Sequence, residues 1–272
     1  MATKAFAVIA GVGSGTGSSL ARRFAKEYPI ALLARNPSSY EPLVQEINNS
    51  GGKAIGVSAD TSDEQSVKSA FQTIAQAYEN APCAAAIYNA SGGFVRKPFL
   101  ETGIEDLEKG WGVTVYVSDN NASRSMEAVI DLGLTICHSK GALFFSQATL
   151  PLLLKHAESQ SSDQHPPTLI FTGATASIKA NAQMSTFAAP KWALRAMSMS
   201  LAKEFGPKGV HVAHAVIDGV IDIPKSQEIL KDLDANARLG PEDIAKTYWD
   251  LHTQSRRGFT SEVDIRPMLE KW

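Results

Sequence analysis

The feature that most constrains the fold of this chain is a glycine cluster near its start, with contrasting hydrophobic patterns on either side. The apolar run at 5–10 is too short for a helix and predicts a buried strand, whereas residues 16–28 have the spacing of an amphipathic helix. A strand, a tight turn and a helix in this order direct backbone N–H groups and the positive end of a helix dipole at one point. The pattern predicts binding of a dinucleotide pyrophosphate; the alternative for a glycine cluster alone is a plain linker.

The spacing of the glycines is the first resemblance to a known family. Gly11-x-x-x-Gly15-x-Gly17 differs from the Gly-x-Gly-x-x-Gly of the usual dinucleotide-binding turn and resembles the turn of the short-chain dehydrogenase/reductase family. Glycines in such a turn let the backbone approach a pyrophosphate without Cβ clashes. The resemblance implies a cofactor-binding turn that comprises Gly11, Ser14, Gly15, Thr16 and Gly17.

The end of the second apolar run bears on the choice of cofactor. This run, at 30–34, is followed by Arg35, where a carboxylate is expected if a site accepts the free ribose hydroxyls of NAD. The planar, always charged guanidinium of an arginine pairs instead with the 2′-phosphate of NADP. We therefore expect NADP (NADPH) as the cofactor; the alternative is a solvated arginine at a strand end.

Two later segments resemble the same family, in the family's order. Asp60 ends a third predicted strand at 54–61, and in the family such an aspartate lies beside the adenine. Asn89 follows a fourth predicted strand, in a segment that resembles the family's Asn-Asn-Ala-Gly turn with Tyr88 in place of the first asparagine. The resemblance implies that Asp60 and Asn89 belong to the cofactor site.

Helical and strand patterns alternate along most of the chain. Helices are expected near 16–28, 40–49, 63–79, 143–154 and 185–205, and strands near 5–10, 30–34, 54–61, 84–88, 168–172 and 210–216, with an edge-strand pattern at 259–267. Such alternation requires parallel strands with right-handed helical crossovers. We predict an α/β fold, a doubly wound parallel-sheet Rossmann fold, as a single domain over 1–272, with the ligand at the carboxyl ends of the strands.

Composition argues against several other classes of protein. A formal charge of −2 and a pI near 6.3, with scattered lysines and arginines, give no basic field for nucleic acid. The start lacks a secretory signal, and no apolar run approaches the roughly 20 residues of a membrane span. The two cysteines, Cys83 and Cys137, have no paired spacing and no histidine cluster, so we expect neither a disulfide nor a metal site. These features predict a cytoplasmic protein whose partner is a small-molecule substrate.

The catalytic residues of the family are only partly present. Reductases of the family use a Tyr-x-x-x-Lys pair, in which the tyrosine moves the proton and the lysine holds the nicotinamide ribose; here Lys191 is present and Phe187 replaces the tyrosine. Phenylalanine has no dissociable proton and cannot act as a general acid. The family's catalytic serine corresponds to Ala174, so either Thr175 or Ser177 supplies a hydroxyl nearby, or each caps local backbone.

Further resemblance lies after the sixth predicted strand. Asp218-Gly219 stands where the family has a Pro-Gly turn that meets the nicotinamide, and the backbone N–H of Ile221 is expected to reach the carboxamide. A subgroup of the family has phenylalanine at the tyrosine position together with the same Ile-Asp-Gly run. The chain resembles that subgroup.

An atypical insertion at about 115–139 interrupts the family pattern. Without it the chain has about 248 residues, a usual size for a single domain. One hypothesis is a retained intron, because 115–117 and 137–139 can be encoded by donor-like and acceptor-like sequences; the alternative is a genuine surface insertion. The family's fourth catalytic residue, an asparagine, aligns with Thr114 from the left and with His138 from the right. In the family, the helix that carries this asparagine belongs to a helix pair that commonly forms the oligomer interface. Because the insertion interrupts that helix, it is left open whether the chain forms a homo-oligomer.

Two functions follow from these patterns. The first is an NADP-dependent oxidoreductase that acts on a carbonyl, alcohol or conjugated alkene of a small, apolar molecule, with Lys191 and Thr175 in catalytic roles. The second is a dinucleotide-binding pseudoenzyme or a non-redox relative that lacks the serine and tyrosine pair. The segments expected to line the substrate pocket are 94–96, 178–180 and the residues after Gly219.

Overall fold

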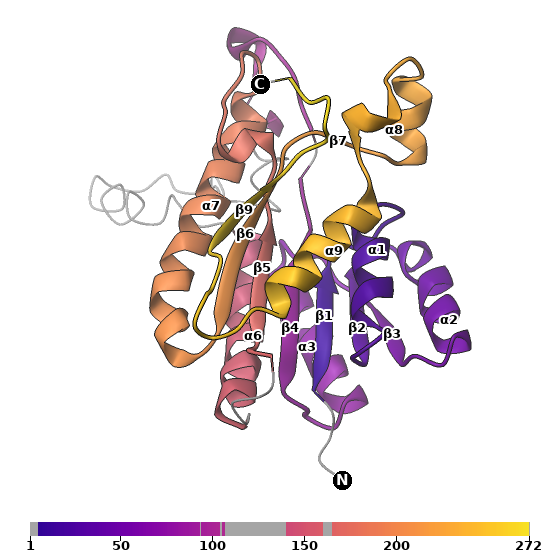
Figure 1. The fold of residues 1–272 in the computed structure, drawn as a ribbon, viewed down its shortest axis with the longest axis vertical. Coiled ribbons are helices and arrows are strands. Elements are labelled where there is room, and N and C mark those ends of the chain that lie inside the picture. Colours follow the sequence, from indigo (N-terminus) through magenta and orange to yellow (C-terminus); the bar gives the residue numbers. More distant parts are fainter. Residues whose placement is uncertain (1–4, 93, 104, 107–139, 160–164, 272) are drawn as a thin grey trace, which may run out of the picture.

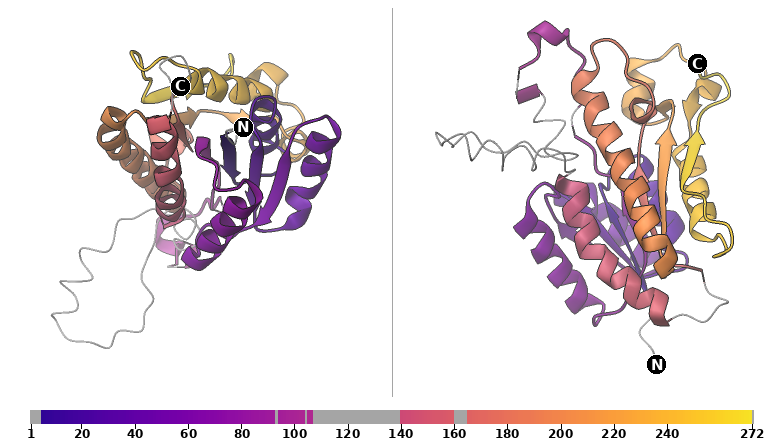
Figure 2. Two further views of the ribbon diagram at one scale, coloured as in Figure 1. Left: turned by 90° about the horizontal axis from the view of Figure 1, so that it is seen from below. Right: turned by 90° about the vertical axis from the view of Figure 1, so that its left-hand side faces the viewer.

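The computed structural model describes residues 5–92, 94–103, 105–106, 140–159 and 165–271. In these ranges a seven-stranded parallel sheet, in the order β3-β2-β1-β4-β5-β6-β9, lies between two layers of helices (Figures 1 and 2). The strands are β1 (Phe6–Ala10), β2 (Ile30–Ala34), β3 (Ala54–Ser58), β4 (Cys83–Tyr88), β5 (Thr168–Thr172), β6 (His211–Ile217) and β9 (Glu262–Ile265). The main helices are α1 (Thr16–Phe24), α2 (Glu41–Asn49), α3 (Glu64–Ala77), α6 (Lys140–Ser159), α7 (Ser185–Phe205), α8 (Pro224–Ile229) and α9 (Pro241–His252).

The central strands are buried on both faces of the sheet. In β1, Phe6, Val8 and Ala10 pack into one core layer, and Ala7 and Ile9 pack into the other. Side chains of a strand alternate between faces, so a strand covered on both sides needs a continuous apolar run. This requirement explains the uninterrupted apolar run at the start of the sequence.

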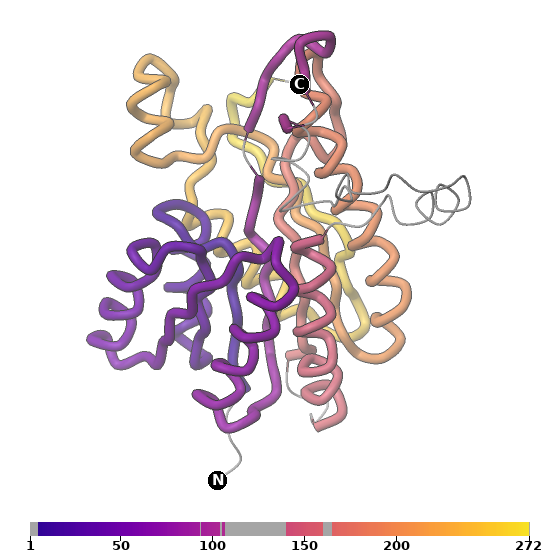
Figure 3. The backbone as a smooth tube through the Cα atoms, turned by 180° about the vertical axis from the view of Figure 1, so that it is seen from behind, coloured from indigo at the N-terminus to yellow at the C-terminus, as the bar shows by residue number. Residues whose placement is uncertain are grey.

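Each face of the sheet is covered by its own set of helices. Apolar residues of α1, α2 and α9 pack on one face, and those of α3, α6 and α7 pack on the other. Figure 3 shows the second face from behind, with α6 and α7 side by side across the strands. The predicted α/β doubly wound fold is therefore confirmed.

Element boundaries differ from the sequence prediction where prolines or turns intervene. The helix expected at 16–28 ends at Phe24. Pro29 disfavours helical backbone in the residue before it, so the chain turns into β2. The strand expected to reach residue 61 ends at Ser58, and the expected edge strand is β9, which pairs in parallel with β6.

The insertion at about 115–139, with Thr114 and His138, lies outside the described residues. In the part of the chain that is described, no helix combines the length and apolar character needed to cross a membrane.

Candidate functional site

Two adjoining cavities open at the carboxyl ends of the strands. The larger, of about 820 Å³, extends from the glycine turn to α7 and the chain after β6, and its walls expose more apolar than polar surface. The smaller, of about 260 Å³, lies beyond the ends of β2 and β3. They share Gly11, Gly13, Asn89 and Ser91, and together they have the extended shape that a dinucleotide requires.

The glycine turn is shaped by close backbone contacts. Gly11 has a φ of +89°, and a Cβ built there would lie 2.4 Å from the backbone nitrogen of Ala90. A Cβ at Gly17 would lie 2.6 Å from the carbonyl oxygen of Gly11, and one at Gly15 would meet Ile223 at 2.7 Å. Each of these three positions therefore excludes a side chain unless its neighbours move.

Asn89 holds this turn from the next strand. Its side-chain amide donates to the carbonyl oxygen of Gly11 at 2.8 Å, and its backbone N–H donates to Ala10 at 2.8 Å. Tyr88, which replaces the first asparagine of the family turn, is buried against Phe145, with ring centroids 5.5 Å apart. Asn89 thus shapes the wall of the cavity, while Tyr88 belongs to the core.

A matched pair of substitutions tests how much the turn depends on Gly11. Gly11→Ala should destabilise the fold by about 3 kcal/mol, because it combines a clash with a strained positive φ. Gly13→Ala is the control, since a Cβ at Gly13 meets nothing within 4 Å and its φ is not positive. Urea unfolding should show a lower midpoint for Gly11→Ala alone; equal midpoints would contradict the close packing of this turn.

The smaller cavity contains the predicted residues Arg35 and Asp60. The carboxylate of Asp60 accepts hydrogen bonds from the backbone and hydroxyl of Ser62 at 2.9 and 2.7 Å, which fixes its orientation. Arg35 is exposed and forms no ion pair within the described ranges. Ser14 lines a separate cavity of about 460 Å³ between α1 and α2, which shares Gly13 and Ser39 with the smaller cavity.

Lys191 lies at the inner end of the larger cavity. Only 4% of this residue is exposed, and its Nζ donates to the carbonyl oxygen of Thr172 at 3.2 Å. Burial lowers the pKa of Lys191 to about 8, because desolvation penalises the ammonium form. The side chain has two further N–H donors and a charge that titrates close to neutral pH.

The wall beside Lys191 is aromatic. Phe187, one helical turn before Lys191, lines the same cavity. Its ring meets that of Phe94 edge to face, with centroids 5.2 Å apart and an angle of 70° between planes. The structure thus places an apolar ring, without an ionisable group, next to the buried lysine.

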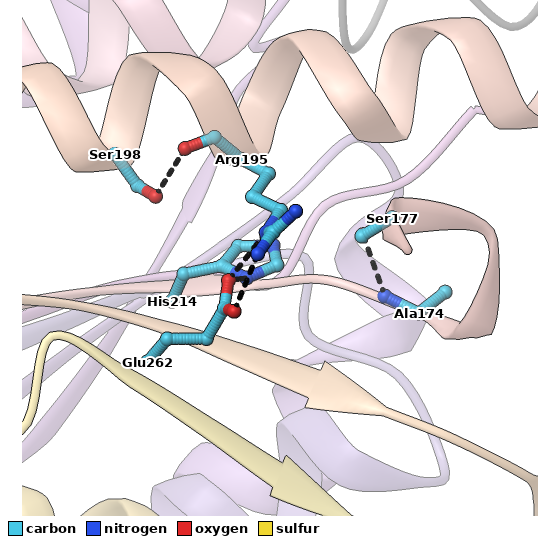
Figure 4. Close-up of polar contacts among 6 residues, drawn as sticks. All are labelled: Ala174, Ser177, Arg195, Ser198, His214 and Glu262. Carbon is cyan, nitrogen blue, oxygen red and sulfur yellow. Dashed lines mark hydrogen bonds and ion pairs between the residues drawn. The ribbon is translucent and has the colours of Figure 1, made fainter. Parts of the chain in front are cut away.

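The loop after β5 separates the two candidate hydroxyls. Ala174, Thr175 and Ala176 line the larger cavity. Ser177 is fully buried, and its Oγ accepts the backbone N–H of Ala174 at 3.1 Å (Figure 4). Ser177 therefore serves the local backbone, whereas Thr175 is the hydroxyl of this loop that lines the cavity.

The chain after β6 forms the opposite wall. Ile221 of the short strand β7 (Val220–Ile221) lines the larger cavity, as does Gly219. The buried carboxylate of Asp218 lies 3.3 Å from Arg266, beyond β9, and a Cβ on Gly219 would lie 2.7 Å from Pro267. These contacts fasten the C-terminal segment to the turn after β6.

The sequence analysis missed several lining residues. They come from two segments without a motif, and they are Asn181, Met184 and Glu270. Glu270 lies in the C-terminal segment, which tertiary contacts with Asp218 and Gly219 bring to the cavity. Each of the predicted lining segments contributes to the wall: Phe94, Lys179 and, after Gly219, Val220, Ile221, Ile223 and Ser226.

Known proteins share this chain's sequence pattern and architecture. Residues 5–234 match the family model described as short chain dehydrogenase. The chain belongs to this family. The short-chain dehydrogenase/reductase eriH of Hericium erinaceus is 25% identical over 278 residues, which cover 97% of this chain and 96% of eriH.

Solved structures of the family agree in fold. A short-chain dehydrogenase from Rhodopseudomonas palustris is 28% identical with a TM-score of 0.69, and the match covers 96% of this chain and 98% of that one. A metagenomic short-chain oxidoreductase in complex with NADP is 21% identical with a TM-score of 0.74, covering 98% and 99% of the two chains. In this chain, within the described ranges, no group of three or more His, Cys, Asp or Glu side chains is placed to hold a metal ion.

Proposed function

We propose that the protein is an NADP-dependent oxidoreductase that acts on a carbonyl, alcohol or conjugated alkene of a small apolar molecule. The observation that carries this proposal is the buried Lys191, which lines one cavity together with the glycine turn and the loop after β5. A pyrophosphate at the turn and a ribose at the lysine fit this arrangement. The proposal includes a cytoplasmic location and leaves open a homo-oligomer.

The proposed roles of the side chains follow from their places in the wall. A bound nicotinamide cofactor supplies the hydride. Lys191 holds the ribose hydroxyls and orients a water that provides the proton. With a pKa of about 8, the side chain can gain or lose a proton near neutral pH. Thr175 donates a hydrogen bond to the substrate oxygen. Alkene reduction suits this site better than alcohol oxidation, because proton delivery to carbon does not require the missing phenol.

The larger cavity and its surroundings favour an apolar substrate. In the described part of the chain nine large hydrophobic residues are exposed, and six of them line this cavity or lie within four residues of a lining residue. They are Phe94, Trp192, Ile229, Leu230, Met268 and Leu269. Exposed apolar residues concentrated at a cavity indicate a binding region for apolar ligands.

Arg35 is the proposed determinant for NADP, because its guanidinium is exposed in the smaller cavity and unpaired within the described residues. Arg35→Ala should weaken binding of NADP⁺ about 10- to 100-fold, since a charge-assisted hydrogen bond contributes roughly 1.5–3 kcal/mol. Binding of NAD⁺ should change less than twofold on this reasoning. Calorimetric titration of both cofactors measures the difference, with Arg257→Ala, an exposed arginine outside these cavities, as the control.

An equal loss of NADP⁺ and NAD⁺ affinity in Arg35→Ala would contradict the assignment to the 2′-phosphate. A loss of the same size in Arg257→Ala would show a general effect of surface charge.

A second candidate function has its own supporting observation. Phe187 and Ala174 both lack the functional group that the family's catalytic pair provides, which favours a dinucleotide-binding pseudoenzyme or a non-redox enzyme. We propose that this phenylalanine is a trait of a subgroup. Titration with NADPH, NADP⁺ and NADH, followed by a panel of carbonyl and alkene substrates, separates the candidates. Tight NADP-selective binding with turnover supports the oxidoreductase, and binding without turnover supports the alternative.

A further inference from the structure

A polar cluster around one buried histidine lies outside the cavity lining, beside the loop after β5. His214 of β6 is fully buried, and its Nδ1 is 3.1 Å from Oε2 of Glu262 on β9. Arg195 of α7 donates two hydrogen bonds to the same carboxylate, at 2.6 and 2.8 Å. Figure 4 shows this cluster beside the hydrogen bond from Ala174 to Ser177.

The surroundings of His214 define which ring nitrogen carries the proton. Hydrogen bonding to Arg195 lowers the pKa of Glu262, so its carboxylate is ionised at neutral pH and can only accept. Nδ1 of His214 must therefore donate. Burial lowers the pKa of His214 to about 4, so the ring is neutral and Nε2 carries a lone pair.

The lone pair on Nε2 of His214 has no hydrogen-bond donor in the described ranges, and the atom is buried. An unsatisfied buried polar atom typically costs about 1–3 kcal/mol. A structure that keeps a histidine in this place therefore needs a donor close by.

A hydroxyl of the loop after β5 lies close to this nitrogen. A Cβ built on Gly173 would lie 2.4 Å from Nε2 of His214 and 2.9 Å from Oγ of Ser177, so both atoms border the space that this glycine leaves open. Oγ of Ser177 accepts the N–H of Ala174, and its own hydrogen is not used in any other bond described. Among the described residues, Nε2 of His214 lacks a donor and the hydroxyl hydrogen of Ser177 lacks an acceptor. Both groups lie beside Gly173.

We propose that Ser177 donates its hydroxyl hydrogen to Nε2 of His214, so that Glu262, His214 and Ser177 form one chain of hydrogen bonds that fixes the loop 173–177. No hydrogen bond joins the two atoms in the structure; a small movement of the Ser177 side chain toward His214 would bring Oγ within hydrogen-bonding distance of Nε2. All three are positioning residues, because the cavity is lined by Ala174, Thr175 and Ala176 of the loop they hold. Their link to catalysis rests on the proposed function; the bond itself does not.

The test is the ¹⁵N resonance of His214 Nε2 in protein labelled with [¹⁵N]histidine, first free and then saturated with NADP⁺. In the wild type we expect the position of a hydrogen-bonded acceptor, and Ser177→Ala should move it to that of a free lone pair. Ser177→Thr should restore it. Ser198→Ala is the matched control, because Ser198 is also a buried serine of this region but bonds within α7, to the carbonyl oxygen of Arg195 at 2.8 Å.

The same Nε2 position in wild type and Ser177→Ala would overturn the bond. If the loop is positioned for the cofactor, NADP⁺ should also shift Nε2 in the wild type but not in Ser177→Ala; a wild-type signal unmoved by bound NADP⁺ would overturn the positioning role. Failure of NADP⁺ to bind, measured by calorimetry, would count against the proposed function and would leave the comparison of the free proteins decisive for the bond.

Discussion

Replacing Phe187 by tyrosine should raise the rate of NADPH-dependent carbonyl reduction about 10²- to 10⁴-fold, the usual contribution of a positioned general acid. Phe187 lines the larger cavity one helical turn before Lys191, which is the spacing of the family's catalytic pair. The neighbouring ammonium would stabilise the phenolate and lower the pKa of the new phenol. Loss of NADPH absorbance across a panel of carbonyl compounds measures the gain.

Phe94 provides the matched control for this experiment. Its ring lines the same cavity and touches that of Phe187, but it comes from a loop far from Lys191 in the sequence. Phe94→Tyr adds the same hydroxyl without the family's spacing and should give no comparable gain. A gain in Phe187→Tyr that persists after Lys191→Met would show that the lysine plays no part in it. No gain in Phe187→Tyr with NADPH bound would favour the non-redox alternative.

The sequence was sufficient to predict the fold because the signal in each strand is local. Apolar runs bounded by turns identified the central strands, and their alternation with amphipathic helices required a parallel sheet. The errors lie at element ends. The first helix ends at Phe24, although the amphipathic pattern continues to residue 28; Pro29 restricts only the backbone of Tyr28, at the entry to β2.

Local spacing also predicted the glycine turn and the position of Lys191 on its helix, which line one cavity in the structure, but it did not predict the far wall of that cavity. Glu270 reaches the cavity because β9 pairs with β6 and the chain beyond it is held by Asp218 and Gly219. The local sequence patterns that predict helices and strands do not predict a contact between residues about fifty positions apart. The arrangement of His214 and Glu262 has the same origin, since β6 and β9 bring them together across the sheet.

The two candidate hydroxyls show what only three-dimensional structure resolves. The sequence leaves Thr175 and Ser177 equivalent, because both follow β5 within a few residues. In the fold, Ser177 turns inward to the N–H of Ala174, whereas Thr175 stays in the wall of the cavity. A short helical turn, η3 (Thr175–Ser177), produces this division.

Mild acid should destabilise the protein strongly, because burial lowers the pKa of His211, His214 and His252 and keeps all three neutral; the shift is largest for His214 and His252. Burial lowers the pKa of His214 to about 4 and that of His252 to about 3, and neither residue has any exposed surface. In the unfolded chain both take an ordinary pKa near 6.5, so the unfolded state binds more protons as the pH falls below that value. Stability is therefore complete above pH 6.5 and is lost progressively below it. Between pH 7 and pH 5 each group should cost about 2 kcal/mol.

The roughly 4 kcal/mol lost through His214 and His252 together is a large part of the 5–15 kcal/mol that stabilises a typical domain. Urea unfolding at pH 7 and pH 5 measures the loss. His252→Gln should remove about 2 kcal/mol of it, because glutamine does not titrate but can still reach the hydroxyl groups of Tyr28 and Thr168 that now bond both ring nitrogens, at 2.9 and 3.0 Å. A variant that lowers stability equally at both pH values would show that His252 contributes only packing, and a wild type equally stable at pH 7 and pH 5 would contradict the neutral burial of His214 and His252.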